Sequence, residues 1–243
     1  MTVEIKQKIT DYLNNVGYNG FKYLDTKFRE YLKINWPDRI ANVEFPTNKG
    51  DIACFIPRAN EEISFNNEIR NNEIEFVMEI TDVDDTSWST LLHQYNVTAD
   101  PSIPKNRIAH CAQQIYAGNI GYHRGDGARI CIRSDKGLWY YRTDSNENII
   151  HLGKQVDNYA VFGAIGINNH NANGFKNSSE GCIIIASEHE QDQYQDDFKP
   201  LLTKVKNNLN TVHNNIPMYV IDEDFWDTFD FNPDSANKAT SSN

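Results

Sequence analysis

The chain has 243 residues, of which 39% are hydrophobic and 12% aromatic, so it can bury one large core. Its formal net charge of −11 would repel a phosphate backbone, which argues against a nucleic-acid partner. Four cysteines are too few for a disulfide scaffold in a chain of this length. None forms a Cys-x-x-Cys pair, which argues against a thiolate zinc site.

The N-terminus predicts two consecutive helices. Apolar residues recur at helical spacing from Val3 to Val16, and "GYNG" (17–20) then breaks the pattern. A second apolar face runs from Phe21 to Leu32 and ends before Trp36, because a residue that precedes proline avoids the helical region. We therefore expect residues 1–41 to form a helical appendage packed on the main domain.

No targeting or membrane segment is expected. The first fifteen residues lack the apolar central stretch of a signal peptide, and no apolar run is long enough to span a bilayer. This pattern predicts a cytoplasmic protein, or one exported without a cleaved N-terminal signal to act in the periplasm or cell wall.

From about residue 42 the apolar period changes from helical to two, which predicts short strands. We expect an α+β domain over residues 42–230 with a β-sandwich-like core, in which "YAVFGAIGI" (159–167) is a central strand. A helix is expected around 198–209, a strand at "IPMYVID" (216–222), and a disordered tail over 231–243. The other expected strands are "NVEFP", "GDIACFIP", "EIEFVMEI", "LLHQYNVTA", "RIAHCAQQIYA", "ARICIRS", "LWYYRTD" and "NIIHLG".

The stretch "HNANGFKNSSEGC" (170–182) carries the candidate site. A thiol is a nucleophile only as thiolate, and it then needs a nearby base and donors for an oxyanion. Cys182 follows Gly181, which allows close approach; His170 ends a predicted strand; and Ser179 adds a hydroxyl. The same residues also fit a surface loop followed by a buried cysteine. The other three cysteines lie in strand-like apolar runs and are expected in the core: Cys54, Cys111 and Cys131.

The order strand, His, loop, Ser-x-Gly-Cys, apolar run, helix and strand resembles the catalytic half of L,D-transpeptidases over about residues 76 to 222. These enzymes cross-link or trim bacterial peptidoglycan. The resemblance implies an L,D-transpeptidase-type catalytic core with Cys182 as nucleophile and His170 as base. It also implies that the carbonyl of Asn171 orients the imidazole, that Ser179 and Gly181 are the remaining fixed positions, and that no cofactor or metal is needed.

A second element, "GYHRGDGARICIR" (121–133), is similar to a divergent phage and bacterial branch of this family. That similarity implies a substrate cleft lined by Tyr122, His123 and Arg124.

Three features depart from the family pattern. Glu180 stands where the family usually has His, Ile184 stands where it usually has Arg, and only eleven residues separate the base from the nucleophile. Arg124 or Arg129 could replace the missing arginine as a carboxylate clamp. Glu180 is a solvated surface residue, or pairs with Arg124 or Lys176, or binds a substrate amino group. We expect its carboxylate to point away from the Cys182 sulfur, because like charges disfavour the thiolate.

These residues predict a cysteine-dependent transferase or hydrolase acting on peptidoglycan stem peptides. Such an enzyme would be a phage lysin, an effector delivered into another cell or a recycling enzyme, and an inhibitory or delivery protein would be a further partner. Two alternatives stay open: a binding module that kept the fold and lost the reaction, and a Cys-His hydrolase that acts on proteins.

Overall fold

A computed structural model describes residues 3–58, 73–84, 87–98, 108–123, 129–143, 160–171, 182–185, 193–208 and 214–232. The helical segments are α1 (Val3–Asn35), η1 (Pro37–Arg39), the π-helical turn η3 (Tyr194–Phe198), α3 (Lys199–Asn207) and α4 (Glu223–Trp226). The strands are β1 (Ile52–Pro57), β2 (Glu73–Val83), β3 (Trp88–Thr98), β4 (Ile108–Cys111), β5 (Gln114–Tyr122), β6 (Ile130–Arg133), β7 (Leu138–Thr143), β8 (Val161–Gly163), β9 (Asn168–Asn171), β10 (Ile183–Ile185) and β11 (Ile216–Ile221).

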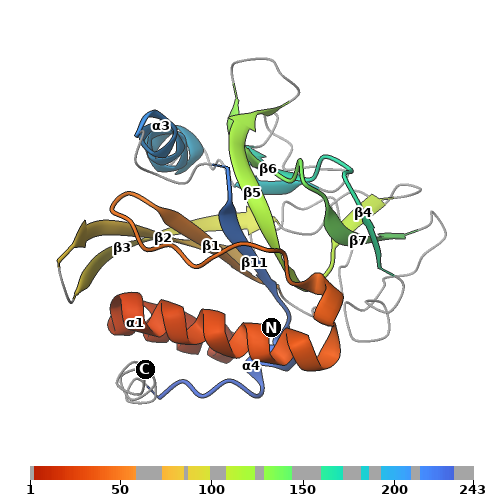
Figure 1. The fold of residues 1–243 in the computed structure, drawn as a ribbon, viewed down its shortest axis with the longest axis horizontal. Helices are drawn as coiled ribbons and strands as arrows, with labels where there is room; N and C mark the ends of the chain where they lie inside the picture. Colours follow the sequence, from red (N-terminus) through yellow and green to blue (C-terminus); the bar gives the residue numbers. More distant parts are fainter. Residues whose placement is uncertain are drawn as a thin grey trace.

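Eight of these strands close into a barrel in the order β1-β11-β5-β6-β9-β10-β3-β2, and β4, β7 and β8 form a small second sheet (Figure 1). The fold is α+β, as predicted. The β-sandwich-like core was wrong, because the described strands form a barrel rather than two facing layers. The parallel pairing of β1 with β11 joins the first and last strands of the barrel sheet. Closure pairs edges that a sandwich would leave open.

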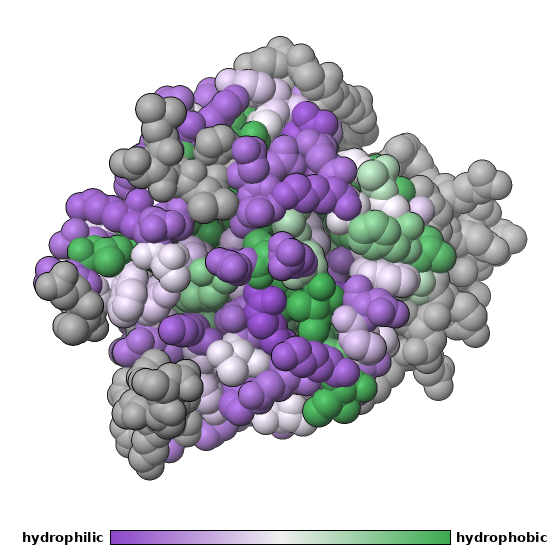
Figure 2. Space-filling view, viewed as in Figure 1, coloured by the Kyte–Doolittle hydropathy of each residue, from purple (hydrophilic) through white to green (hydrophobic). Residues whose placement is uncertain are grey.

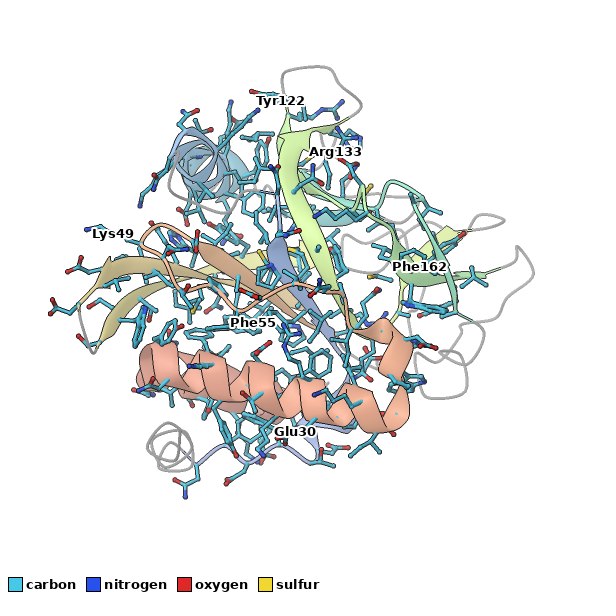
Figure 3. The ribbon with its side chains drawn as sticks, viewed as in Figure 1. Glu30, Lys49, Phe55, Tyr122, Arg133 and Phe162 are labelled. Carbon is cyan, nitrogen blue, oxygen red and sulfur yellow. The ribbon has the colours of Figure 1, made fainter. Side chains whose placement is uncertain are left out.

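Helix α1 lies along one side of the barrel and is two helices joined at a kink (Figure 1). Gly17 has φ 54° and ψ −154°, a conformation outside the helical region that glycine adopts without a Cβ clash. The break predicted at "GYNG" is therefore confirmed. On the C-terminal side of the kink, the centroid of the Phe21 ring lies 5.4 Å from that of Phe55, which projects from β1 toward α1 (Figure 3). This apolar interface covers the outer face of β1, β2 and β11.

The barrel interior holds a second core, built by strict alternation along the strands. In β1, Cys54 and Ile56 belong to the interior core, whereas Ala53 and Phe55 belong to the core beneath α1. All six residues of β1 are therefore buried. Cys54, Cys111 and Cys131 are buried as predicted.

Helix α3 confirms the predicted amphipathic helix. Phe198, Leu201, Leu202 and Val205 are buried in the interior core, while the predicted Leu209 lies outside the described residues. Strand β11 confirms the prediction for "IPMYVID".

Four local predictions need correction or fall outside the described chain. "YAVFGAIGI" yields only β8, at the edge of the small sheet, with Val161 and Phe162 52% and 60% exposed. Gly166 has φ +73° and turns the chain into β9, so the apolar run cannot continue as one strand. "NVEFP" forms no strand, "RIAHCAQQIYA" splits into β4 and β5, and "NIIHLG" lies outside the described residues.

The C-terminal part of the described chain packs back on α1. The Phe231 ring stacks on that of Trp226 at 6.0 Å and meets Tyr12 edge-on, so order extends past the predicted start of the tail at 231. Residues 233–243 lie outside the described part.

No helix in the described ranges is both long and apolar enough to cross a bilayer. Figure 2 shows a mostly hydrophilic face on which hydrophobic residues lie in several separate places, one of them over the small sheet.

Candidate functional site

The candidate site is built on the parallel pair β9–β10. Ile184 pairs with His170, and Ile183 pairs with Asn169. Cys182 directly precedes β10, so extending the register places it beside Asn168. A strand spacing of about 4.8 Å and a rise of about 3.3 Å per residue put the Cα atoms of Cys182 and His170 about 8 Å apart. The fold therefore brings the predicted nucleophile and base to adjacent strands.

The loop before β9 contacts the thiol directly. Cys182 is partly exposed, and its Sγ lies 3.7 Å from the carbonyl oxygen of Gly166. The Ser134 hydroxyl donates a 2.6 Å hydrogen bond to the carbonyl of Ile167, which fixes the end of this loop beside the residue that follows β6. Cys182 is thus the one cysteine that combines a fixed backbone setting with solvent access.

The structure describes part of the predicted catalytic set. His170 and Asn171 are described as backbone within β9, and Asn171 pairs with Ile185. Their side chains lie outside the description, so the expected contact between Sγ and the imidazole stays a prediction. Ser179, Glu180, Gly181 and Arg124 also lie outside the described residues.

Tyr122 and His123, predicted to line one cleft, lie in different surroundings. His123 is buried, and its Nδ1 accepts a 3.1 Å hydrogen bond from the side-chain amide nitrogen of Asn168. Asn168 is the residue of β9 that the extended register places beside Cys182. The Tyr122 ring is exposed at the end of β5, where the Lys206 ammonium lies 4.0 Å from its centroid (Figure 3). The structure thus links His123 to the strand of the candidate base and Tyr122 to α3. Arg129 is partly exposed and accepts a backbone hydrogen bond from His123.

A buried polar pair that sequence reasoning missed lies beneath the site. The side-chain amide nitrogen (Nδ2) of Asn169 contacts both carboxylate oxygens of Glu75, at 2.5 and 2.6 Å, inside the barrel. Burial raises the pKa of the Glu75 carboxyl to about 7, although hydrogen bonds from Asn169 and Cys54 oppose the shift. Burial also raises the pKa of the Cys54 thiol well above its ordinary value. The run "NNHN" was the available signal, since alternation must turn some of its polar residues inward.

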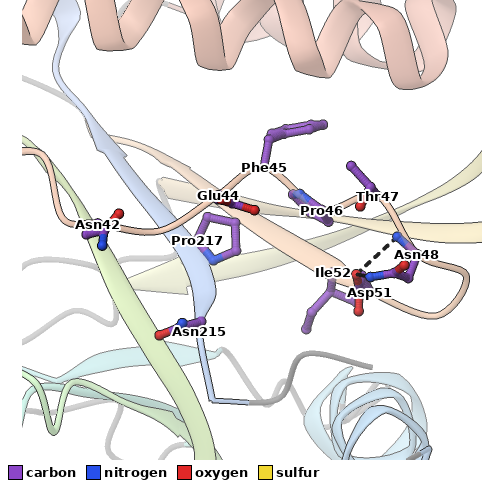
Figure 4. A pocket seen from close by; sticks show the side chains of 10 residues that line it. All are labelled: Asn42, Glu44, Phe45, Pro46, Thr47, Asn48, Asp51, Ile52, Asn215 and Pro217. Atoms are coloured by element: carbon purple, nitrogen blue, oxygen red, sulfur yellow. Dashed lines mark hydrogen bonds between the residues drawn. The ribbon is translucent and has the colours of Figure 1, made fainter. Parts of the chain in front are cut away.

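A separate hollow of about 270 Å³ lies between the segment after η1 and the start of β1 (Figure 4). Its polar lining includes Glu44 and Asp51, and the Asp51 carboxylate accepts hydrogen bonds from the backbone and side-chain nitrogens of Asn48. None of the predicted site residues lines this hollow. Within the described ranges, no group of three or more His, Cys, Asp or Glu residues could hold a metal ion.

Comparisons with known proteins add no assignment: no family model, no curated protein and no solved structure matches the chain.

The exposure of the four thiols predicts their order of reaction. At neutral pH an alkylating agent should label Cys182 first, because Cys54, Cys111 and Cys131 are buried. His170→Ala should slow this labelling if the imidazole assists thiolate formation. Peptide mass spectrometry after brief exposure to iodoacetamide measures both effects. Equal labelling of all four cysteines, or labelling led by Cys54, would contradict the assignment.

Proposed function

We propose that the chain is a cysteine-dependent enzyme that transfers or hydrolyses acyl groups of peptidoglycan stem peptides. The observation that carries the proposal is the parallel β9–β10 pairing, which brings Cys182 and His170 to neighbouring strands. The partly exposed thiol and the order of the surrounding elements support the same assignment. The L,D-transpeptidase-type core is part of this proposal and rests on the Ser-x-Gly-Cys resemblance.

The proposed reaction has two steps that conserve atoms and charge. The Cys182 sulfur attacks a peptide carbonyl and His170 takes the thiol proton. Backbone amides near Cys182 and the Ser179 hydroxyl stabilise the oxyanion, and the amine leaves with the proton from His170. A second amine, in transpeptidation, or water, in hydrolysis, then attacks the thioester while His170 takes its proton, and His170 returns that proton to the Cys182 sulfur as it leaves.

The proposed place of action follows from the substrate. Peptidoglycan lies in the periplasm or cell wall, so the enzyme would reach it as a lysin or a delivered effector. A recycling enzyme would instead meet released wall peptides in the cytoplasm.

Mass spectrometry of defined muropeptides after incubation with the purified chain tests the proposal. We expect a loss of a terminal residue, a cut stem or a new cross-link, each dependent on Cys182 and unaffected by EDTA. EDTA inactivation reversed by zinc would rule out the thiol mechanism. A protein substrate cleaved while muropeptides stay intact would identify a Cys-His protein hydrolase, and no turnover of either would identify a binding module.

A further inference from the structure

We propose that Glu75 and Asn169 form a positioning pair for the Cys182–His170 site, with two hydrogen-bonded arrangements that differ by one proton on the Glu75 carboxyl. The inference rests on the proposed function in taking Cys182 and His170 as the reacting pair.

The Glu75–Asn169 pair is connected to Cys182 and His170 through the backbone of β9 and β10. Asn169 directly precedes His170 in β9 and pairs with Ile183, which directly follows Cys182. Asn169 also pairs with Ile132 on its other side. By holding the Asn169 side chain, Glu75 therefore helps to fix β9, the strand of the base, against β10, the strand that follows the nucleophile.

The observed arrangement leaves one buried acceptor unsatisfied. Both Glu75 oxygens contact the single amide nitrogen of Asn169, and the Asn169 carbonyl oxygen has no hydrogen-bond partner although it is buried. An unsatisfied buried acceptor destabilises the state that contains it. Glu75 is itself fully buried, which disfavours its charge.

Uptake of one proton from solvent would remove both penalties. If the Asn169 amide turns over, the protonated carboxyl donates its O–H to the Asn169 oxygen, and the Asn169 nitrogen donates to the other Glu75 oxygen. The pair then makes two complementary hydrogen bonds and carries no charge. The pKa of about 7 places this exchange in the neutral range.

The other titratable groups around Glu75 do not compete for this proton. The Cys54 thiol donates a hydrogen bond to Glu75, and burial raises its pKa well above the ordinary value. Tyr95 and Tyr116 face the same interior, and burial raises the pKa of both hydroxyls, with the Glu75 charge adding to the shift. Over the neutral range these three groups stay protonated, so Glu75 is the member of the set that changes charge.

The charge on Glu75 should also act on Cys182. Glu75 contacts Asn169, Asn169 pairs with Ile183, and Ile183 directly follows Cys182; in addition, the ionised forms of Glu75 and Cys182 both raise the pKa of Tyr116. A carboxylate there disfavours a second anion. The ionised pair should therefore lower the reactivity of Cys182, and the neutral pair should restore it.

Glu75→Gln tests this directly, because glutamine is neutral and can make both hydrogen bonds of the protonated arrangement. At about pH 8 we expect iodoacetamide to label Cys182 about twofold or more faster in the variant than in the wild type, and at about pH 6 at nearly equal rates. Glu79→Gln is the matched control, since Glu79 is buried on the same strand but contacts His93 and Lys204. It should follow the wild-type pH profile.

A titration of the wild type needs no variant to fold. The side-chain amide signals of Asn169 in NMR spectra should shift with a midpoint near 7, the value given by the Glu75 pKa. In Glu75→Gln they should stay constant. Flat wild-type signals, an unchanged labelling profile in Glu75→Gln, or the same change in Glu79→Gln would each overturn the inference.

The same measurements separate this inference from the proposed function. If wild-type Asn169 titrates and Glu75→Gln alters Cys182 labelling while muropeptides stay intact, only the proposed function fails. If muropeptides are turned over and Glu75→Gln behaves as the wild type, only the positioning pair fails. If Cys182 resists labelling altogether, the NMR titration of the Asn169 side chain alone decides whether the Glu75–Asn169 pair exchanges a proton.

Discussion

Replacing Cys182 with alanine is expected to lower muropeptide turnover by about 10⁴-fold or more, because the residues of a nucleophilic site act as a unit and little covalent chemistry survives the loss of one. The remaining groups can still bind substrate, so substrate affinity should change far less than the rate. Initial rates from mass spectrometry of the released peptide, together with binding of an uncleaved muropeptide by calorimetry, measure the two effects separately.

Cys131→Ala provides the matched control for this loss. Cys131 is a fully buried cysteine on β6, the strand that pairs with β9. Its loss leaves a small cavity that lowers the unfolding temperature, while turnover per folded molecule should stay near the wild-type value. If Cys182→Ala keeps about a tenth of the wild-type rate or more, Cys182 is not the nucleophile.

Local patterns predicted those elements whose structure depends on nearby residues. The helical break at Gly17, the buried face of α3 around Leu202, and β11 all follow from spacing within one segment. Turn glycines and apolar periods act over a few residues, so a single sequence records them.

The closure of the barrel could not be read in this way. It depends on β1 pairing with β11, and their register joins Cys54 with Met218, far apart in the chain. The apolar run around Phe162 misled for a related reason, because hydrophobicity indicates burial but does not say where a strand ends. The strand in that run, β8, ends at Gly163, and Gly166 turns the chain before β9 begins at Asn168.

The candidate site likewise contains features that follow from local sequence and features that depend on distant residues. The sequence predicted a strand that ends near His170 and an apolar run after Cys182, but it did not predict that these segments pair as β9 and β10. Glu75 was missed because "EIEFVMEI" alternates charged and apolar residues, a pattern typical of a strand with one solvent face. In the structure both faces are covered: Phe76 lies beneath α1, and Glu75 points into the barrel toward Asn169, 94 residues away.

Replacing Asp222 with alanine is expected to lower the free energy of unfolding by about 3–5 kcal/mol, because it removes the carboxylate that pairs with the buried guanidinium of Arg58. The Arg58 and Asp222 side chains are only 1% and 7% exposed, and two parallel hydrogen bonds of 2.6 Å join them. Arg58 also donates to the carbonyl of Cys111, so the pair ties the ends of β1, β11 and β4 together. Urea unfolding at neutral pH, followed by tryptophan fluorescence, measures the loss.

Two further variants determine whether the effect belongs to a buried charge. Asp82→Ala removes the partner of Lys49 from an ion pair whose side chains are both 67% exposed, and it should cost about 0–1 kcal/mol. The double variant Arg58→Met with Asp222→Leu removes both buried charges and should recover most of the stability lost in Asp222→Ala, because no uncompensated charge remains inside. If the double variant is less stable than Asp222→Ala, the hydrogen bonds between the strand ends matter more than the buried charge, and the electrostatic argument for this pair fails.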